Sequence, residues 1–206
     1  MHRTMKRLLF VTVVILITSG MAQSEVRTVP RETQDETLIT GKTRLGFFVA
    51  PVMKITELND NVEAFTGGHA GLIINRNFMI GVGGFGLADD FEYGTARDPL
   101  VDFGYGGLLV GYINNSHELI HLSVHSLIGG GGLCYRRWYD VWYDEQYIDA
   151  VFVLEPGLDL ELNVTRYFRI GLGGSYRLVY GVNFDDLSNY DVSGPAASVT
   201  FKLGKF

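Results

Sequence analysis

The chain has 206 residues, of which 17 are Lys or Arg and 23 are Asp or Glu, and its formal net charge is −6 at pH 7. It is 47% hydrophobic and 13% aromatic, with 26 Gly and 5 Pro, a composition that excludes a disordered protein and favours an all-β one. The length fits one domain with appendages, and the acidic balance argues against nucleic acid as a partner.

The first 22 residues have the three parts of a secretory signal peptide. A positive segment with Arg3, Lys6 and Arg7 precedes the apolar run 8–18, and small residues follow up to Ala22. Because the apolar run is shorter than the roughly 20 residues that a membrane-spanning helix needs, we predict cleavage after Ala22 rather than a membrane anchor. The mature chain would then have 14 Lys/Arg against 23 Asp/Glu, a net charge of −9.

The rest of the chain divides into a polar leader and a series of alternating segments. Residues 23–42 are polar and mixed in charge, which predicts a flexible periplasmic leader. From 43 to 206 the apolar residues alternate as in strands, and no stretch has a sustained helical period. The expected strands are 43–56, 62–74, 77–88, 100–113, 118–130, 147–163, 166–182 and 194–206.

The connections between these strands alternate in length. Tight turns are expected at 75–76, 114–117 and 164–165, and longer polar loops at about 57–61, 89–99, 131–146 and 183–193. In an up-and-down sheet this order places every tight turn at the same end, as in bacterial outer-membrane barrels.

A short internal echo accompanies two of the turns. The segment 76–84 reads RNFMIGVGG and the segment 166–174 reads RYFRIGLGG, and each follows a tight turn and opens a strand. Duplication and convergence on a common strand composition both explain the likeness.

Glu155, Asp159 and Glu161 illustrate how charge is distributed in the strands. All three are odd-numbered, so they share one face of their strand, because side chains alternate across a strand. The even positions of the same strand form a continuous apolar face, made of Phe152, Leu154, Pro156, Leu158, Leu160, Leu162 and Val164.

Two architectures use such two-faced strands. A soluble barrel or sandwich turns its apolar face inward, whereas a membrane barrel turns that face outward to lipid. The polar faces here are rich in glycine and nearly balanced in charge, which favours the membrane barrel. A narrow lumen needs glycine to make room for long side chains, and an unpaired buried charge costs several kcal/mol.

We therefore predict a polar network in the lumen. Arg169 and Arg177 are expected to pair with the acids of the preceding strand. The predicted members are Arg44, Lys54, Glu63, His69, Asp102, His121, His125, Glu155, Asp159, Glu161, Arg169, Arg177 and Lys202.

The signal peptide, the eight alternating segments of 43–206, the tight turns at one end and the final Phe206 together resemble the small outer-membrane β-barrels of the OmpA/OmpX type. The resemblance is one of pattern rather than of motif, and it covers the chain after the leader. It implies an eight-stranded antiparallel up-and-down transmembrane β-barrel in a Gram-negative outer membrane, with a plugged lumen and no open pore. Phe206 is one position out of register with Phe201 and Leu203, and a bulge or frayed end near Gly204 would restore the register.

Two local motifs have a plain strand interpretation. Residues 81–86 fit GxGxxG but lie within a strand with no helix after it, so we expect no nucleotide site. His121 and His125 share a strand face about 13 Å apart, which favours lumen hydrogen bonds over a shared metal site. We expect no cofactor, metal or catalytic residue.

Other functions remain open as alternatives. Ser123, His125 and Glu155 face inward on neighbouring strands and resemble the hydrolytic set of a lipid A-modifying enzyme, although nothing in the sequence fixes an oxyanion hole. A soluble periplasmic lipocalin-like ligand-binding barrel is the third possibility, and it requires the two faces to be inverted.

The densest aromatic cluster is expected in the longest loop. It fits an aromatic girdle at headgroup level or a recognition loop, since Tyr, Trp and Arg are common binding anchors. We expect a monomer with a structural or surface-interaction role, whose partners are outer-membrane lipid and an extracellular ligand or protein at the long loops. The candidate surface residues are Tyr135, Arg136, Arg137, Trp138, Tyr139, Trp142 and Tyr143.

Overall fold

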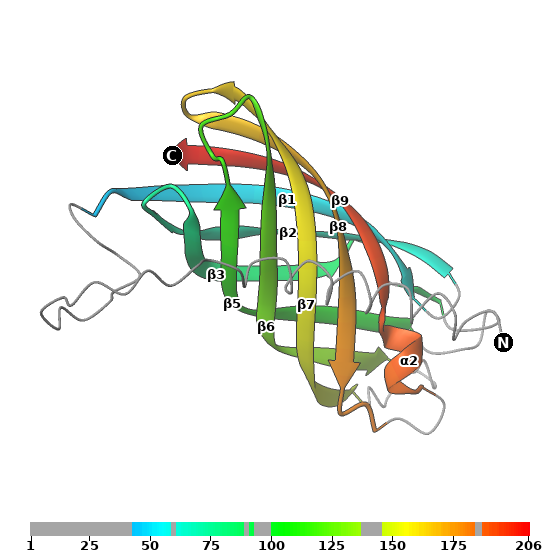
Figure 1. Cartoon of the computed structure of the whole chain (residues 1–206). Helices are drawn as coiled ribbons and strands as arrows, with labels where there is room; N and C mark the ends of the chain where they lie inside the picture. The colour runs from blue at the N-terminus through cyan, green and yellow to red at the C-terminus, as the bar shows by residue number, and fades with distance from the viewer. Residues whose placement is uncertain (1–42, 59–60, 89–90, 93–99, 137–145, 184–186) are drawn as a thin grey trace, which may run out of the picture. The chain divides into compact units, whose positions relative to one another are not determined.

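The computed structural model describes residues 43–58, 61–88, 91–92, 100–136, 146–183 and 187–206 (Figure 1). The predicted signal peptide 1–22 and leader 23–42 lie outside these residues, as do most residues of the aromatic loop.

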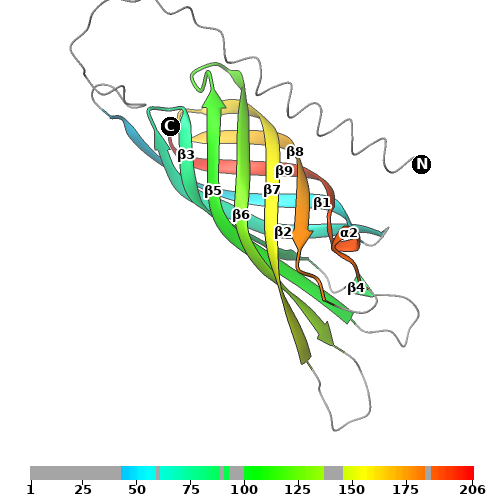
Figure 2. The same ribbon diagram turned by 60° about the horizontal axis from the view of Figure 1, so that its bottom comes forward.

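Eight long strands form a closed antiparallel barrel, which confirms the predicted fold class (Figures 1 and 2). Each strand pairs with its neighbours in the chain, and β1 pairs with β9 to close the barrel. The two-residue strand β4 (Phe91–Glu92) adds only a short pairing to β5. The barrel strands are β1 (Leu45–Leu58), β2 (Asn61–Ile74), β3 (Phe78–Leu87), β5 (Leu100–Asn114), β6 (Ile120–Arg136), β7 (Gln146–Thr165), β8 (Phe168–Tyr180) and β9 (Gly194–Lys205).

Alternation of side chains sets which residues face outward. In β1, exposed and buried residues alternate along the whole strand, with Met53 61% exposed and the adjacent Lys54 only 4% exposed. The same pattern leaves Leu160 and Leu172 half or more exposed on β7 and β8. The apolar faces therefore point out of the barrel, and the inverted arrangement that a lipocalin-like barrel requires is not the one observed.

The interior is apolar as well as charged, which corrects the expectation of a polar lumen. The interior of an eight-stranded barrel is just wide enough for side chains to fill, and here apolar side chains fill much of it. One apolar cluster, the loop-end cluster, consists of Val52, Leu58, Phe65, Phe85, Phe103, Tyr105, Leu127, Leu133, Val151, Val153, Val179, Leu187 and Val192. A second, the turn-end cluster, consists of Phe48, Ala50, Ile73, Met79, Leu109 and Ile113.

Three turns mark one end of the barrel, which we call the turn end. They lie at 75–77, 115–119 and 166–167. The third turn was expected at 164–165 but lies two residues later, because β7 continues to Thr165 past a register shift after Asn163.

The opposite end, the loop end, carries the other connections. The loop expected at 57–61 is wrong, because pairing of β1 with β2 continues to Leu58 and Asn61 and leaves only 59–60 between them. The hairpin of β6 and β7 extends past the end of β8 at this end, because its pairing reaches Arg136 and Gln146 whereas the pairing of β7 with β8 begins at Phe152 (Figure 2).

A short helix, α2 (Asn189–Val192), lies at the loop end before β9. Val192 and the preceding Leu187 are buried in the loop-end cluster, so this segment covers the interior there. Asp191 accepts a hydrogen bond from the Ser188 main-chain N–H at 2.9 Å, which satisfies one donor at the helix start. Within the described ranges, no helix is long and apolar enough to cross a membrane.

Candidate functional site

Glu155 on β7 is the centre of one buried polar cluster. Its Oε1 accepts from Lys54 Nζ of β1 at 2.7 Å and from Ser175 Oγ of β8 at 2.6 Å, and its Oε2 accepts from Tyr105 of β5 at 2.7 Å. The Lys54 ammonium also lies 3.3 Å from the centre of the Phe85 ring. Charge-assisted bonds of this kind are stronger than neutral ones, so the cluster ties four strands together across the interior.

Glu161, nearer the turn end on β7, is the centre of a second cluster. It pairs with Lys202 of β9, with His121 Nε2 of β6 at 3.3 Å and with Arg169 Nη1 of β8 at 3.4 Å. Arg169 in turn donates through Nη2 to the carbonyl and hydroxyl of Ser116, at 3.2 and 3.0 Å. This carboxylate therefore joins β6, β8 and β9 on the side of the barrel opposite the turn-end cluster.

His125 and Asp159 form a third contact between these clusters, with Nδ1 and Oδ2 3.4 Å apart. The His69 ring lies edge-on to His125, with 5.7 Å between ring centres. Glycine makes this contact possible, because a Cβ on Gly157 would lie 2.7 Å from His125 Nε2 and one on Gly173 only 1.8 Å from Asp159 Oδ1.

The predicted pairing of Arg177 with an acid of β7 is wrong. Among the described residues no ion pair joins it to a carboxylate. Its Nε donates to the Val192 carbonyl at 2.9 Å, and its guanidinium lies 4.8 Å from the centre of the Phe65 ring. The side chain is 1% exposed, so an arginine with helix-carbonyl and aromatic partners replaces the predicted charge pair.

Two predicted members of the network lie outside the interior. Arg44 is exposed and precedes β1, and Asp102 is exposed near the loop end of β5. Asp102 falls on the even-numbered face of β5 with the exposed Leu108 and Tyr112, so its strand position turns it outward. Glu63 of β2 is half-buried. The remaining ten members are buried or nearly so, namely Lys54, His69, His121, His125, Glu155, Asp159, Glu161, Arg169, Arg177 and Lys202.

The candidate surface loop lies almost entirely outside the described residues. The backbone of Tyr135 and Arg136 ends β6, and the described chain resumes at Gln146 on β7. The aromatic girdle and the recognition loop therefore both stay predictions.

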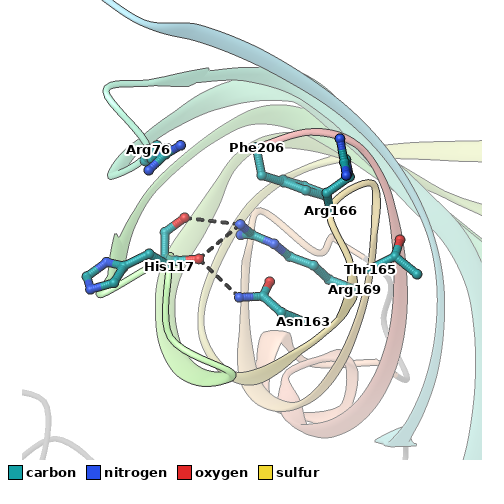
Figure 3. Close-up of a pocket in the computed structure, with 8 residues that line it drawn as sticks. Arg76, His117, Asn163, Thr165, Arg166, Arg169 and Phe206 are labelled. Atoms are coloured by element: carbon teal, nitrogen blue, oxygen red, sulfur yellow. Dashed lines mark hydrogen bonds between the residues drawn. The ribbon is translucent and has the colours of Figure 1, made fainter.

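A cavity at the turn end was not among the predicted sites. It has a volume of about 230 Å³ and is lined by Arg76, Ser116, His117, Asn163, Thr165, Arg166, Arg169 and Phe206 (Figure 3). The terminal aromatic thus faces this cavity: Phe206 packs against the turn-end cluster with its ring 3.8 Å from Arg169 Cζ. Pairing of β9 with β1 passes through Gly204 to Lys205 without a register shift, so the bulge expected near Gly204 is absent there and Phe206 does not join the outer face.

One feature of the sequence points to this cavity, namely the internal echo between two segments that each follow a tight turn. Arg76 and Arg166 are the first residues of the two echo segments, 76–84 and 166–174. Each follows a strand end at the turn end of the barrel, so the echo brings both arginines to the same cavity.

Comparison with known proteins identifies the fold. No family model matches the chain, and no curated protein matches it. The solved structure of Neisserial surface protein A covers 81% of this chain and 100% of its own, at 12% identity and a TM-score of 0.55. The chain has the fold of a small outer-membrane β-barrel.

Two further barrels of this kind are similar at lower TM-scores. The N-terminal β-barrel domain of Pseudomonas aeruginosa OprF has 11% identity and a TM-score of 0.47, with 76% of this chain and 96% of that one covered. The attachment invasion locus protein of Yersinia pestis, solved with the heparin analogue sucrose octasulfate, has 14% identity and a TM-score of 0.41, with 78% and 95% covered.

In this outer-membrane-type barrel the three residues of the hydrolytic alternative are not joined to one another. Ser123 is fully buried and its hydroxyl has no hydrogen-bond partner in the described part of the chain. His125 contacts Asp159, and Glu155 is occupied by Lys54, Tyr105 and Ser175. The described ranges also contain no group of three or more His, Cys, Asp or Glu side chains that could hold a metal ion.

Proposed function

We propose that the protein is an integral outer-membrane barrel with a structural or surface-interaction role and no open pore. The observation that carries this proposal is the apolar outer surface, on which Met53, Ile55 and Leu172 are each 61% exposed. Soluble monomers rarely expose contiguous apolar patches of more than a few hundred Å², whereas a lipid-facing barrel requires such a band. A charge there would cost about 2–4 kcal/mol for Lys or Arg at mid-bilayer. The outward-facing charges Glu57 and Asp102 lie near the loop-end limits of their strands.

The filled interior supports a closed rather than a conducting barrel. The loop-end cluster and α2 fill the loop end, where the cluster contacts the Glu155 ion pair, and the turn-end cluster and the ion pairs of Glu161 fill the turn end. An eight-stranded barrel has an interior just wide enough for its own side chains, whereas aqueous channels need many more strands.

The long β6–β7 hairpin supports an interaction at the loop end. β6 has 17 residues and β7 has 20, more than the about 9–11 residues with which a tilted strand crosses a bilayer. We propose that this hairpin presents the candidate surface loop to an extracellular ligand or protein. Closure of the sheet leaves no unpaired barrel edge, which is consistent with a monomer that has membrane lipid as its main partner.

Fractionation of cell envelopes tests the membrane placement. Washing with carbonate or urea strips peripheral proteins, so the barrel is expected to stay in the membrane pellet while a soluble periplasmic control protein is released. Release of the barrel together with the control would overturn the proposal.

The proposed role includes no catalysis, in contrast to the lipid A-modifying alternative. We expect Ser123→Ala and His125→Ala to leave the acyl pattern of lipid A unchanged, because Ser123 has no base against it. Mass spectrometry of lipid A from cells that overproduce each variant provides the measurement, and a pattern that differs from wild type would restore the enzymatic alternative.

A further inference from the structure

The cavity at the turn end is lined mainly by donors of hydrogen bonds and by positive charge. Arg76 comes from the β2–β3 turn, Arg166 from the β7–β8 turn, and Arg169 from the start of β8. No Asp or Glu side chain is among its described lining residues. In Figure 3 the side chains of Arg76 and Arg166 stand on opposite sides of the opening, with Arg169 between and below them.

Beneath the cavity, one carboxylate is shared by two cations. Glu161 pairs with both Lys202 and Arg169, and the ion pairs of the described residues give neither cation a second carboxylate, because the neighbouring Asp159 contacts His125. Arg76 and Arg166 add two exposed positive charges without an ion pair in the described part of the chain. Phe206 offers Arg169 its ring, and its terminal carboxylate is in none of these ion pairs. A buried cation that shares its carboxylate is only partly compensated, so an anion in this cavity would stabilise Arg169.

Arg169 is held in place before any ligand arrives. It is 3% exposed, both of its Nη atoms have partners, and the Phe206 ring lies against its guanidinium at 3.8 Å. Its Nε–H, which is buried, has no hydrogen-bond partner in the described part of the chain. A fixed guanidinium loses less entropy on binding than a free surface arginine, so this residue forms a preorganised base for the site.

Arg76 occupies a backbone position that normally selects glycine. Asn75 and Arg76 have φ values of 52° and 68°, and the Asn77 N–H donates to the Ile74 carbonyl at 3.1 Å, which defines a two-residue turn of type I′. Gly, Asn and Asp dominate such turns because a side chain at positive φ is strained. The turn thus places an arginine on the rim of the cavity where glycine would be more stable, and local strain of this kind often marks functional sites.

We propose that this turn-end cavity binds a phosphate group. A phosphate offers up to two charges and at least two free oxygens, which suits several guanidinium groups around one space, whereas a carboxylate fills a single guanidinium fork. The cavity is smaller than the roughly 300–1,000 Å³ of sites for drug-sized ligands, so it fits one small anionic group. That group belongs either to an anionic phospholipid of the adjacent leaflet or to free phosphate, and only the lipid source rests on the proposed membrane placement.

Binding of inorganic phosphate to the protein purified in a non-ionic detergent tests the site. Calorimetric titration at low salt is expected to show saturable binding, with at least a tenfold loss of affinity in the Arg76→Gln/Arg166→Gln double variant. Arg44→Gln is the matched control, because Arg44 is an exposed arginine at the same end that does not line the cavity. It is expected to change the affinity less than twofold.

Arg76→Gly separates binding from folding. Glycine is unstrained at φ 68°, so this variant is expected to lose phosphate affinity without a lower unfolding midpoint. A residue with a purely structural role would lower the midpoint instead and leave phosphate binding unchanged.

A second measurement distinguishes the two sources of phosphate. Native mass spectrometry of protein released from phosphatidylcholine nanodiscs that contain phosphatidylglycerol counts the retained phosphatidylglycerol. Less retention in the double variant than in wild type and Arg44→Gln assigns a lipid phosphate, and equal retention together with the calorimetric loss assigns free phosphate. The proposal is overturned if neither phosphate nor phosphatidylglycerol binds saturably, or if Arg44→Gln weakens binding as much as the double variant does.

Discussion

Glu155 receives hydrogen bonds from Lys54, Tyr105 and Ser175, which come from three other strands and which the chain separates by 20 to 101 residues. The net value of such a buried pair is small, because removing two charges from water offsets most of their attraction. Losing one partner is a different matter, since the remaining charge is left buried at full cost. Removing one charged residue from this interior therefore destabilises the barrel mainly through the unpaired charge that remains.

Replacing Glu155 with Leu tests this balance. We expect Glu155→Leu to lower the free energy of unfolding by about 3–5 kcal/mol, because Lys54 keeps its charge at a position that is 4% exposed. The double variant Lys54→Met/Glu155→Leu should recover most of the loss, because both charges are then absent. Glu57→Leu, at an exposed position, should change stability by no more than about 0.5 kcal/mol. Equilibrium unfolding by urea in detergent measures all three, and a midpoint unchanged by Glu155→Leu would contradict the pairing.

At the scale of one strand, the inner face of β8 combines two long cations with small residues. Arg169 and Arg177 point into the barrel with Gly171, Gly173 and Ser175 between them. The small residues leave space that side chains from β7 occupy, so glycine in this strand is a packing requirement. Otherwise glycine weakens a strand interior relative to alanine.

The two inward-facing glycines of β8, Gly171 and Gly173, give opposite predictions. A Cβ on Gly173 would lie 1.8 Å from Asp159 Oδ1 and 2.9 Å from the Leu158 carbonyl oxygen, so Gly173→Ala should destabilise the barrel by about 1–3 kcal/mol. A Cβ on Gly171 would meet its nearest neighbour, Thr200 Cβ, at 3.4 Å, so Gly171→Ala should be neutral or stabilising by up to about 1 kcal/mol. Urea unfolding in detergent compares the pair. If the two substitutions change stability equally, crowding against Asp159 is not the reason that position 173 requires glycine.

At the scale of the whole molecule, most of the barrel follows from a period of two in the sequence. Strand positions and the outward apolar faces are local properties, and β1 shows them without interruption from Leu45 to Leu58. The sequence predicts a loop at 57–61 because the polar residues there resemble one, although the strands on both sides remain paired up to Leu58 and Asn61. It predicts Asp102 in the interior because an exposed charge near a strand end has the same appearance in sequence as a buried one.

The partners of the buried charges could be predicted less well than their placement. The pair of Arg169 and Glu161 spans neighbouring strands and was expected from their order in the chain. Arg177 instead finds a carbonyl of α2, a segment whose helix the sequence pattern does not reveal. The turn-end cavity depends on three turns that meet only when the sheet closes, so its residues are scattered from Arg76 to Phe206.

The orientation of the barrel is the central claim, and fluorescence quenching of one tryptophan tests it most directly. Trp138 and Trp142 are replaced with Phe, and Leu172, which is 61% exposed, is replaced with Trp. Glu118→Trp in the same background, at an exposed position of the 115–119 turn, is the control. In bilayers whose lipids carry bromine on their acyl chains, Trp at 172 should be strongly quenched and insensitive to aqueous iodide, whereas Trp at 118 should respond to iodide. Quenching of Trp at 172 by iodide alone would contradict the lipid-facing orientation.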